Sequence, residues 1–520
     1  MRALQEISAE LLSPKGLHET LETVIRRAID LFVCDAGSLY LRDGQGLYFE
    51  VAVNESKAIN FERHKLSNQV GLARHSYEAG QAVRIADVYS LPKSAPYRFD
   101  STFDQKVGYR TKSVLVYPIR NMAGEVIGVV QLINRKRRRG QKWPVTNAAE
   151  LRKMPAFTIQ DERLLASFAA VVSAAIENAR LNKNIQDLFE GFVTASVQAI
   201  ESRDLATRGH SDRVAYLTVD LAKMVDRDES RELRDFRFTK AQLSEIRYAA
   251  LLHDFGKIGV REDTLNKEEK LLPTQKLEIR ARFDGFRAAA EVSSLREYLN
   301  QLVRENRAPN EFEMKALEKR IREFGLKIED YWALVLSLNE PTILAEDKSK
   351  RLDELSHVHC VDCHGKSQPL LQESEVFCLK IKRGSLTDDE RREIESHVTH
   401  TYEYLKKIPW TPDLAGIPEI AYGHHERVDG RGYPRKIGAG DIPVQSRIMA
   451  VCDIFDALVA SDRPYKPSLP VEKALAILED QGRTGGLEPA VVKAFVEGRV
   501  YESPDFAKLC PHLKVNKKAA

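Results

Sequence analysis

The hydrophobic pattern of the first third of the chain alternates between helical and strand-like periods. Residues 17–32 carry apolar side chains three and four positions apart, which predicts an amphipathic helix. Residues 113–134 contain two strand-like runs joined by a turn at Gly124. Shorter alternating runs lie at residues 37–42, 46–53 and 81–88. A helix before and after a strand-rich middle favours a small α/β sensory domain over an enzyme core.

From Thr158 onward the pattern becomes helical and stays helical to Glu201. A helix over Asp161–Glu201 would be roughly 60 Å long. We expect its apolar stripe to pair two copies of the chain in parallel, so that the connecting helix makes a homodimer and carries a signal. A helix packed only on its own domain is the alternative. The stripe consists of Leu165, Phe168, Ala169, Val172, Ala175, Ile176 and Ala179.

Composition narrows the function classes. A chain of 520 residues is too long for one core, so two or three domains are expected. Its net charge of +3 is too small to argue for a nucleic-acid polymer, and six cysteines do not make a disulfide scaffold. No apolar run approaches the roughly 20 residues that span a bilayer, and the N-terminus lacks a signal-peptide pattern. We therefore expect a cytoplasmic protein with no membrane partner.

Imidazole and carboxylate side chains recur in four segments of the second half. Such groups are tolerated in a protein interior when they coordinate metal. Six of them exceed one tetrahedral site and fit two divalent metals about 3.5–4 Å apart, bridged by a carboxylate and a hydroxide. Mixed ligation of this kind suits iron, manganese or zinc, and we favour iron or manganese. The six are His253, Asp254, His397, His424, His425 and Asp453.

The first segment resembles a GAF domain over about residues 1–180. The resemblance rests on Asn134-Arg135 followed by Phe157 and the pair Asp161-Glu162. Phosphodiesterase-type GAF domains that bind cyclic nucleotides carry Asn-Lys, then Phe-x-x-x-Asp-Glu, so Arg135 replaces a lysine. The resemblance implies the GAF fold and leaves open a small-molecule or cyclic-nucleotide ligand. Alternatively, the acidic pair simply favours the start of the next helix through its dipole.

The second half resembles the HD-GYP family, a branch of the HD phosphohydrolases, over about residues 190–270 and 376–510. The matching motifs are HDFGKIG, HHERVDGRGYP and DIFDALVASDRPYK. The resemblance implies an all-α helical bundle that hydrolyses cyclic di-GMP, a bacterial second messenger. The implied products are the linear dinucleotide pGpG or GMP.

The resemblance also implies residue roles. His253, Asp254 and Asp453 match ligands of one metal, with Asp254 bridging to a second metal held by His397, His424 and His425. Lys257 would act with Asp254 beside the phosphate and the bridging hydroxide. Asp456 and Asp429 are expected to support the ligands from behind. Substrate contacts are expected from Tyr433 of the Gly432-Tyr433-Pro434 turn, Arg463, Lys466 and His210.

One departure from the family concerns the number of metals. Some members hold a third metal through a glutamate four residues before the histidine of a Gly-His pair. Here that position is Ala206, four before His210, so we expect two metals. His210 would then support a ligand or face the substrate, unless it is a satisfied histidine at a helix end.

Residues 262–375 separate the two arms of the expected metal site, where the family core needs only a short connection. Most of this segment is therefore an insertion, and Pro309 and Asn310 divide its helical pattern into an antiparallel pair. We expect that pair to dock on the catalytic core or on a partner chain. The expected order is a GAF domain (1–160), a connecting helix (161–201) and an HD-GYP domain (190–520) interrupted by the insertion.

The insertion also contains the sequence HVHCVDCHGK. Cys360-x-x-Cys363-His364 matches the pattern for covalent haem c attachment, which normally requires an exported chain. Zinc could instead use Cys360 and Cys363 with His357, His359 or His364, although only one CxxC is present. Ordinary packing, a zinc or redox site, and haem are therefore the alternatives.

The implied reaction is metal-assisted phosphodiester hydrolysis. Two cations would lower the pKa of a shared water, and the hydroxide would attack phosphorus while the 3′ oxygen leaves in line. Lys257, Arg463 and Lys466 would offset the charge on the phosphoryl oxygens. The alternatives are a catalytically silent receptor or docking protein, and an HD hydrolase that acts on another cyclic dinucleotide.

Overall fold

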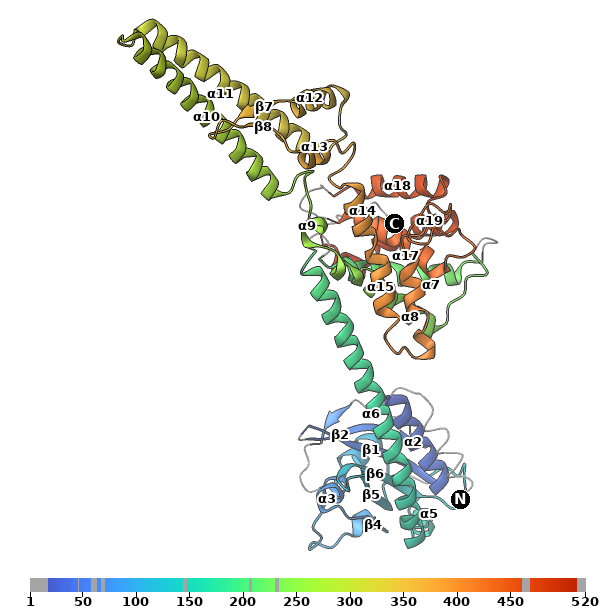
Figure 1. Ribbon diagram of the computed structural model, residues 1–520. Coiled ribbons are helices and arrows are strands. Elements are labelled where there is room, and N and C mark those ends of the chain that lie inside the picture. Colours follow the sequence, from blue (N-terminus) through green and yellow to red (C-terminus); the bar gives the residue numbers. More distant parts are fainter. Residues whose placement is uncertain are drawn as a thin grey trace. The chain divides into compact units, whose positions relative to one another are not determined.

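The computed structural model divides the chain into two compact units, Met1–Gly191 and Phe192–Ala520 (Figure 1). The boundary falls inside one helix, α6 (Ile159–Glu201). The residues that the structure describes are 17–44, 46–57, 63–66, 71–143, 147–204, 208–229, 233–460 and 468–511.

The first unit is built on an antiparallel sheet whose strand order is β3-β2-β1-β6-β5-β4. Helices α2 and α6 share a core with one face of this sheet, and α3 packs on the other face (Figure 1). The strands are β1 (Cys34–Asp43), β2 (Gly46–Asn54), β3 (His64–Lys65), β4 (Val83–Ile85), β5 (Val114–Arg120) and β6 (Val126–Arg135). The helices are α2 (Leu17–Phe32), α3 (Leu72–Ala79), η1 (Val88–Ser90), α4 (Thr102–Val107) and α5 (Ala148–Lys153).

Alternation along the strands explains why both faces of the sheet are covered. In β6, Val130 and Leu132 face the core under α2 and α6, whereas Val129 and Ile133 face the side of α3. Successive strand residues point to opposite faces, so a strand with apolar residues at both sets of positions needs a layer on each side. The predicted α/β sensor fold is confirmed.

The apolar stripe of α6 packs within the first unit. Phe168, Val172 and Ile176 are fully buried, in the same core as α2 and the sheet. The prediction that this stripe pairs two chains is therefore wrong, and the alternative of packing on its own domain holds for it. An apolar period predicts that a face is buried, but it does not identify the partner.

We expected no apolar run long enough to cross a membrane, and helix α6 contradicts this expectation. By length and composition alone it qualifies, with a mean hydropathy of 1.4 over its most apolar window. Of that window, 44% is buried inside the chain's own fold. Packing against the sheet accounts for the apolar residues from Leu165 to Ile176, so the window is weak evidence for a membrane span.

The second unit is largely helical. Helix α7 (His210–Arg227) packs against α8 (Lys240–Leu252) and α17 (Val444–Val459), and α15 (His397–Leu405) packs against α16 (Ile417–Tyr422). The remaining elements of this bundle are η3 (Phe255–Gly259), α9 (Glu262–Leu265), α14 (Asp388–Glu395), η4 (Pro412–Leu414), α18 (Val471–Arg483), α19 (Pro489–Gly498), η5 (Val500–Glu502) and α20 (Pro504–Leu509).

The insertion forms a helical hairpin with its own core. Helices α10 (Pro273–Glu305) and α11 (Glu311–Asn339) run antiparallel, and Arg280 of α10 pairs with Glu329 of α11 (Figure 1). The chain reverses just before α11, whose first turn is capped by the side chain of Asn310. Smaller elements complete this part: α12 (Glu346–Ser356), β7 (His359–Val361), β8 (Ser367–Pro369) and α13 (Glu373–Leu379).

Candidate metal centre and active site

The HD motif sits where α8 ends against the start of α15. His253 caps the C-terminal end of α8 and is followed by Asp254 and the short helix η3. Thr401 ties the two elements together, because its Oγ1 donates to the carbonyl oxygen of His253 and accepts from the N–H of Gly256. At Gly256 a Cβ would lie 1.9 Å from the carbonyl oxygen of His397. Glycine is therefore required for the two motifs to approach this closely.

Three histidines are oriented by the same local device. The Nδ1 of His253, His397 and His424 each donates to the carbonyl oxygen three residues earlier, at 2.6–2.7 Å. This bond fixes the ring and aims Nε2 away from the backbone. All three Nε2 atoms are buried and lack a hydrogen-bond partner among the described residues. Buried imidazole nitrogens without partners are the donors expected of metal ligands.

Two carboxylates stand among these nitrogens. Asp254 has Oδ1 3.2 Å from Nε2 of His397 and Oδ2 3.4 Å from Nε2 of His253, so it lies between the two. Asp453 has Oδ1 3.2 Å from Nε2 of His210 and Oδ2 3.9 Å from Nδ1 of His425. Each carboxylate thus faces two histidines from different segments, as a bridging group would.

Within the described residues, the donor atoms of two trios each lie within 4.8 Å of one another. One trio is His397, His424 and His425, the set that the family resemblance assigns to the second metal. The other is His210, His253 and Asp254. The nitrogen and oxygen donors, their burial and the unpartnered Nε2 atoms fit divalent metals. The structure thus brings together all six predicted ligands and adds His210 to them.

His210 stands at the first turn of α7, held by a buried carboxylate. Its Nδ1 donates to Oδ2 of Asp456 at 2.8 Å, and Arg213 donates to both oxygens of Asp456. Burial by itself would lower the pKa of His210, but the hydrogen bonds of Asp453 and Asp456 outweigh it and raise the pKa to about 10. The predicted supporting position of Asp456 agrees with these contacts.

Burial also lowers the pKa of three other histidines. It lowers the pKa of His253, lowers that of His424 well below its usual value, and lowers that of His425 to about 4. Neutral imidazoles are the form that binds metal. Burial opposes ionisation of Asp254 as well, but Lys257 and His253 keep its pKa well below the usual range.

Lys257 lies one turn after the HD pair. Its Nζ is 2.9 Å from Oδ2 of Asp254 and 2.8 Å from Oδ2 of Asp204. Burial disfavours the cation, yet Asp254 and Asp204 outweigh this effect and raise the pKa of Lys257. Asp204 was not predicted. It precedes α7 in the sequence, where it could be noticed only as an acidic residue near Gly209-His210.

The GYP turn packs on the histidine pair. The ring of Tyr433 lies 4.8 Å from that of His425, centroid to centroid. A Cβ at Gly432 would lie 2.4 Å from the backbone nitrogen of Arg427, which is why this position is glycine. Buried Glu426, also not predicted, accepts from the N–H groups of Arg435 and Ile437 and holds the turn. Asp429 pairs with Arg427, so its contacts lie within this turn.

Three positions used in the sequence argument fall outside the described residues: Ala206, Arg463 and Lys466.

In the part of the chain that the structure describes, the CxxCH cysteines belong to neither candidate metal group. Cys360 is half-buried against the core of the insertion and Cys363 is exposed. Neither belongs to a group of three ligand atoms within 4.8 Å of one another among the residues described. Burial also raises the pKa of the Cys360 thiol, which disfavours the thiolate. Ordinary packing is therefore the interpretation that these contacts favour.

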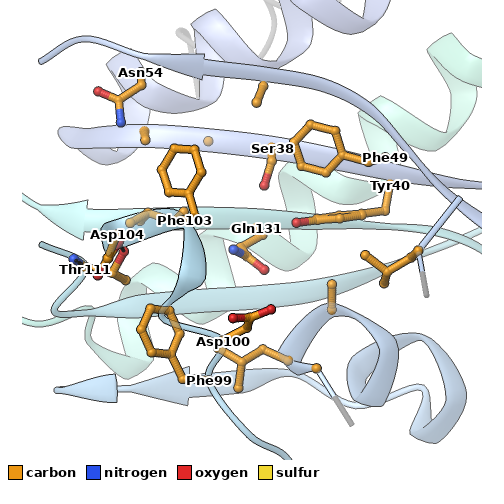
Figure 2. Close-up of a pocket in the computed structure, with 18 of the residues that line it drawn as sticks. Ser38, Tyr40, Phe49, Asn54, Phe99, Asp100, Phe103, Asp104, Thr111 and Gln131 are labelled. Carbon is orange, nitrogen blue, oxygen red and sulfur yellow. Dashed lines mark hydrogen bonds between the residues drawn. The ribbon is translucent and has the colours of Figure 1, made fainter. Parts of the chain in front are cut away.

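The first unit contains a cavity of about 330 Å³ between its sheet and residues 98–111 (Figure 2). Ser38 and Gln131, neighbours on β1 and β6, present polar groups at its floor. Aromatic side chains surround them. The buried carboxylate of Asp104 accepts hydrogen bonds from Thr111 and from the hydroxyl of Tyr89, which holds residues 98–111 over the cavity. The aromatic residues are Tyr40, Phe49, Phe99 and Phe103.

The residues that carry the GAF resemblance make contacts within the fold of this unit. Arg135 pairs with Asp161 at 2.7 Å, and Phe157 is buried in the core. The other oxygen of Asp161 accepts from the N–H of Thr158 just before α6, so the carboxylate fixes the start of that helix. This contact supports the predicted role of Asp161 at the start of the helix.

Residues 16–176 match the GAF domain family, and residues 207–347 and 373–491 each match an HD domain family. This chain joins a GAF domain to an HD domain of the HD-GYP type. The first HD match contains His210, His253 and Asp254 and continues into the insertion as far as residue 347. The second contains His397, His424 and His425. HD domains of this family are metal-dependent, in agreement with the donor sets described above.

Curated relatives of the HD domain are cyclic-dinucleotide enzymes. The chain is 41% identical over 103 residues to 3′3′-cGAMP-specific phosphodiesterase 3 of Vibrio cholerae, covering 20% of this chain and 22% of that protein. It is 38% identical over 138 residues to a cyclic di-GMP phosphodiesterase of the same organism, covering 25% and 28%. A cyclic di-GMP phosphodiesterase of Thermotoga maritima is 34% identical over 205 residues, covering 35% and 53%. The matches thus span about a fifth to a half of these relatives.

Proposed function

We propose that the chain is a metal-dependent phosphodiesterase that hydrolyses cyclic di-GMP to pGpG, GMP or both. The observation that carries the proposal is the buried set of three unpartnered Nε2 atoms, each aimed by a backbone carbonyl, with Asp254 and Asp453 between them. Its likeness to relatives named cyclic di-GMP phosphodiesterases supplies the substrate class.

The donor sets support two metals. His397, His424 and His425 would hold one, and His253, Asp254 and Asp453 the other, with Asp254 shared. We further propose His210 as a ligand in the group of His253, Asp254 and Asp453 rather than a substrate contact, because its Nε2 faces Asp453 and Asp254. A bound cation would take the place of the Nε2 proton that these carboxylates favour in the metal-free protein. Divalent cations bound there would supply Lewis-acid chemistry, lowering the pKa of water and offsetting negative charge on phosphate oxygens.

The chain's own residues have separate tasks in this proposal. Lys257 stays cationic between Asp254 and Asp204, so it can attract a phosphate oxygen and hold Asp254 ionised. Tyr433 presents its ring beside His425, where a nucleotide base or ribose could rest on it. Arg463 and Lys466 are proposed to contact the phosphates on the strength of the family motif. Fixed cations positioned in advance stabilise developing phosphoryl charge without reorganising.

The GAF domain is proposed to regulate the hydrolase. Its cavity has an apolar aromatic wall and a small polar floor, the make-up of a small-molecule site. A small molecule or a cyclic nucleotide is the proposed ligand class. Regulation requires that this ligand bind two conformations of the protein with different affinity.

The test combines metal analysis with product identification. The full chain, purified without oxygen, should contain two metal ions per chain and convert cyclic di-GMP to pGpG or GMP. A second substrate, 3′3′-cGAMP, deserves the same assay because one relative acts on it. Faster turnover of 3′3′-cGAMP would reassign the substrate. Absence of turnover of both by fully metal-loaded protein would favour a silent receptor.

A further inference from the structure

The floor of the cavity in the first unit carries a buried hydroxyl that has no hydrogen-bond partner among the described residues. It belongs to Ser38, which is 4% exposed, although the hydroxyl of Tyr40 lies nearby. Ser38 points into the cavity from β1, next to Gln131 on β6 (Figure 2). Buried polar atoms are normally paired, so an unpaired hydroxyl that lines a cavity indicates a polar group of a ligand.

Aromatic rings form the walls of this cavity. Phe49 comes from β2, whereas Phe99 and Phe103 belong to residues 98–111, which cover the sheet (Figure 2). The volume of about 330 Å³ lies at the lower end of the range for ligand sites, so it suits a small molecule. Aromatic side chains interact favourably with other flat rings. The walls therefore favour a small aromatic ligand.

Asp100 adds an anionic acceptor to the lining. Its Oδ1 accepts hydrogen bonds from the hydroxyl and the N–H of Thr102, and these bonds lower the pKa of the carboxyl. The second oxygen remains for a ligand, and in Figure 2 the carboxylate points toward the amide of Gln131. An ionised carboxylate can only accept hydrogen bonds, so the ligand must present an N–H or O–H donor to it.

The charges of the lining disfavour a phosphate. Two carboxylates, Asp100 and Asp104, line the cavity, and the basic residues of its described lining are His64 and Arg98. Arg98 donates to three carbonyl oxygens within residues 93–97, so its guanidinium is turned into its own loop. Arginine and lysine are the usual partners of phosphate groups in proteins. A phosphate in this cavity would meet carboxylates without gaining such a partner.

The start of α3 also lines the cavity, at Gly71 and Leu72. Its first N–H groups favour a hydrogen-bond acceptor, but they amount to only about half a positive charge. A ring nitrogen or a carbonyl oxygen of the ligand suits them without a phosphate. Two neighbouring segments, 58–62 and 67–70, lie outside the described residues, and neither contains lysine or arginine.

A nucleobase matches this set of groups. Its ring is flat, and its edge presents N–H donors beside carbonyl or ring-nitrogen acceptors. Enzymes that take a single base out of a duplex hold it in the same way, by stacking it between aromatic or apolar side chains and by hydrogen bonds to its edge. In this cavity Asp100 would accept from an N–H of the base, while Ser38 and Gln131 would bind the rest of the edge.

We propose that the cavity binds a free nucleobase or its nucleoside and discriminates against the same base when it carries a phosphate, as in a cyclic nucleotide. The proposal rests on the proposed function of this domain as a ligand sensor, and it narrows the ligand class given there. Binding to the cavity is independent of the reaction at the metal centre, so each is tested separately.

Isothermal titration calorimetry of the full chain tests the ligand class. The probes are guanosine, adenosine, cytidine and uridine, together with the four free bases and the four 3′,5′-cyclic monophosphates. At least one nucleoside or free base should bind. Its cyclic monophosphate should bind at least about tenfold more weakly, because the carboxylates repel the phosphate. Comparison of base with nucleoside shows which of the two is the better ligand.

Variants show that binding occurs in this cavity and not at the metal centre. Asp100→Asn should weaken binding by at least about tenfold and Ser38→Ala by about three- to tenfold, because each removes a hydrogen bond to the base. Asp30→Asn is the matched control and should bind as the unmodified chain does. Asp30 is an exposed acid on α2, which covers the opposite face of the sheet. Circular dichroism checks that the variants keep their fold.

Three results would overturn the proposal: no binding of any base or nucleoside, equal or tighter binding of the cyclic monophosphates, or unchanged affinity in Asp100→Asn. Hydrolysis of cyclic di-GMP is measured on the same samples, with and without the ligand. Hydrolysis without binding of a base would contradict only the ligand class, and binding without hydrolysis would contradict only the proposed reaction. Binding that leaves the rate of hydrolysis unchanged would confirm the ligand class and contradict the proposed regulation.

Discussion

The carboxylate of Asp456 holds the imidazole of His210 through a 2.8 Å hydrogen bond to Nδ1. The same carboxylate receives two hydrogen bonds from Arg213, and it is fully buried. Its orientation is thus fixed from two sides, which directs Nε2 of His210 toward Asp453. Carboxylates behind a ligating histidine fix its tautomer and raise its basicity.

Asp456→Asn should therefore weaken metal binding or lower kcat/KM by about 10- to 100-fold, because an amide cannot accept from both His210 and Arg213. Metal content after dialysis against graded chelator, together with turnover, measures the effect. Asp480→Asn at the exposed end of α18 is the control and should behave as the unmodified protein does. Unchanged affinity and turnover in Asp456→Asn would remove His210 from the metal centre.

Removing the carboxylate that is proposed to bridge the two metals should have a larger effect. We expect Asp254→Ala to abolish hydrolysis, with a loss of at least about 100-fold, and to reduce bound metal, because Asp254 lies between His253 and His397. His253→Ala should do the same. Elemental analysis and turnover are compared with Asp263→Ala, an exposed acid on α9. Full metal content and activity in Asp254→Ala would contradict the two-metal assignment.

The candidate ligands were easier to identify from the sequence than the residues that hold them in place. His424 was identifiable because it stands beside a second histidine, and His253 and His397 because their segments resemble the HD-GYP family. Lys257 pairs with Asp204, and Arg213 pairs with Asp456. The partners in each pair are distant in sequence, so only tertiary packing brings them together. His210 was placed with the substrate because its position next to Asp453 depends on how α7 packs against α17.

The fold, too, was predicted in part: its elements followed from the sequence, but the packing partner of α6 did not. The helical and strand periods of the first domain predicted its elements, since periodicity reports burial directly. The apolar stripe through Val172 was assigned to a second chain, whereas it packs on the sheet. A period states that a face is covered without stating by what, so the sequence could not distinguish packing on the same domain from pairing with a second chain.

The metal-free protein should lose stability in mild acid. The pKa of His425 is lowered to about 4 and those of His253 and His424 are also lowered, whereas an unfolded histidine titrates near about 6.5. Between these values the unfolded chain binds more protons than the folded one, so the free energy of unfolding falls as the pH drops. Chemical denaturation in chelator from pH 7 to pH 4.5 measures this slope.

His425→Asn is the matched variant for that titration. It should make the dependence on pH shallower, because one partly buried imidazole no longer has to remain neutral in the folded state. Saturating the unmodified protein with metal should raise the free energy of unfolding at pH 7, since the ions bind the folded site. A metal-free protein equally stable at pH 7 and pH 4.5 would contradict the depressed histidine pKa values.

Two glycines in the same domain should respond to alanine in opposite directions. At Gly256 the added Cβ would lie 1.9 Å from the carbonyl oxygen of His397 and 2.4 Å from the backbone nitrogen of Thr401. The clash forces η3 away from α15, so Gly256→Ala should destabilise the protein by about 1–3 kcal/mol or more and separate His253 from His397. Gly285 lies inside α10, and its added Cβ would meet nothing within 4 Å. Gly285→Ala should stabilise the protein by about 0.5–1 kcal/mol through helix propensity. Chemical denaturation gives both changes in free energy, and metal analysis shows whether only Gly256→Ala loses metal. Unaltered stability and metal content in Gly256→Ala would show that η3 and α15 need not touch for the site to form.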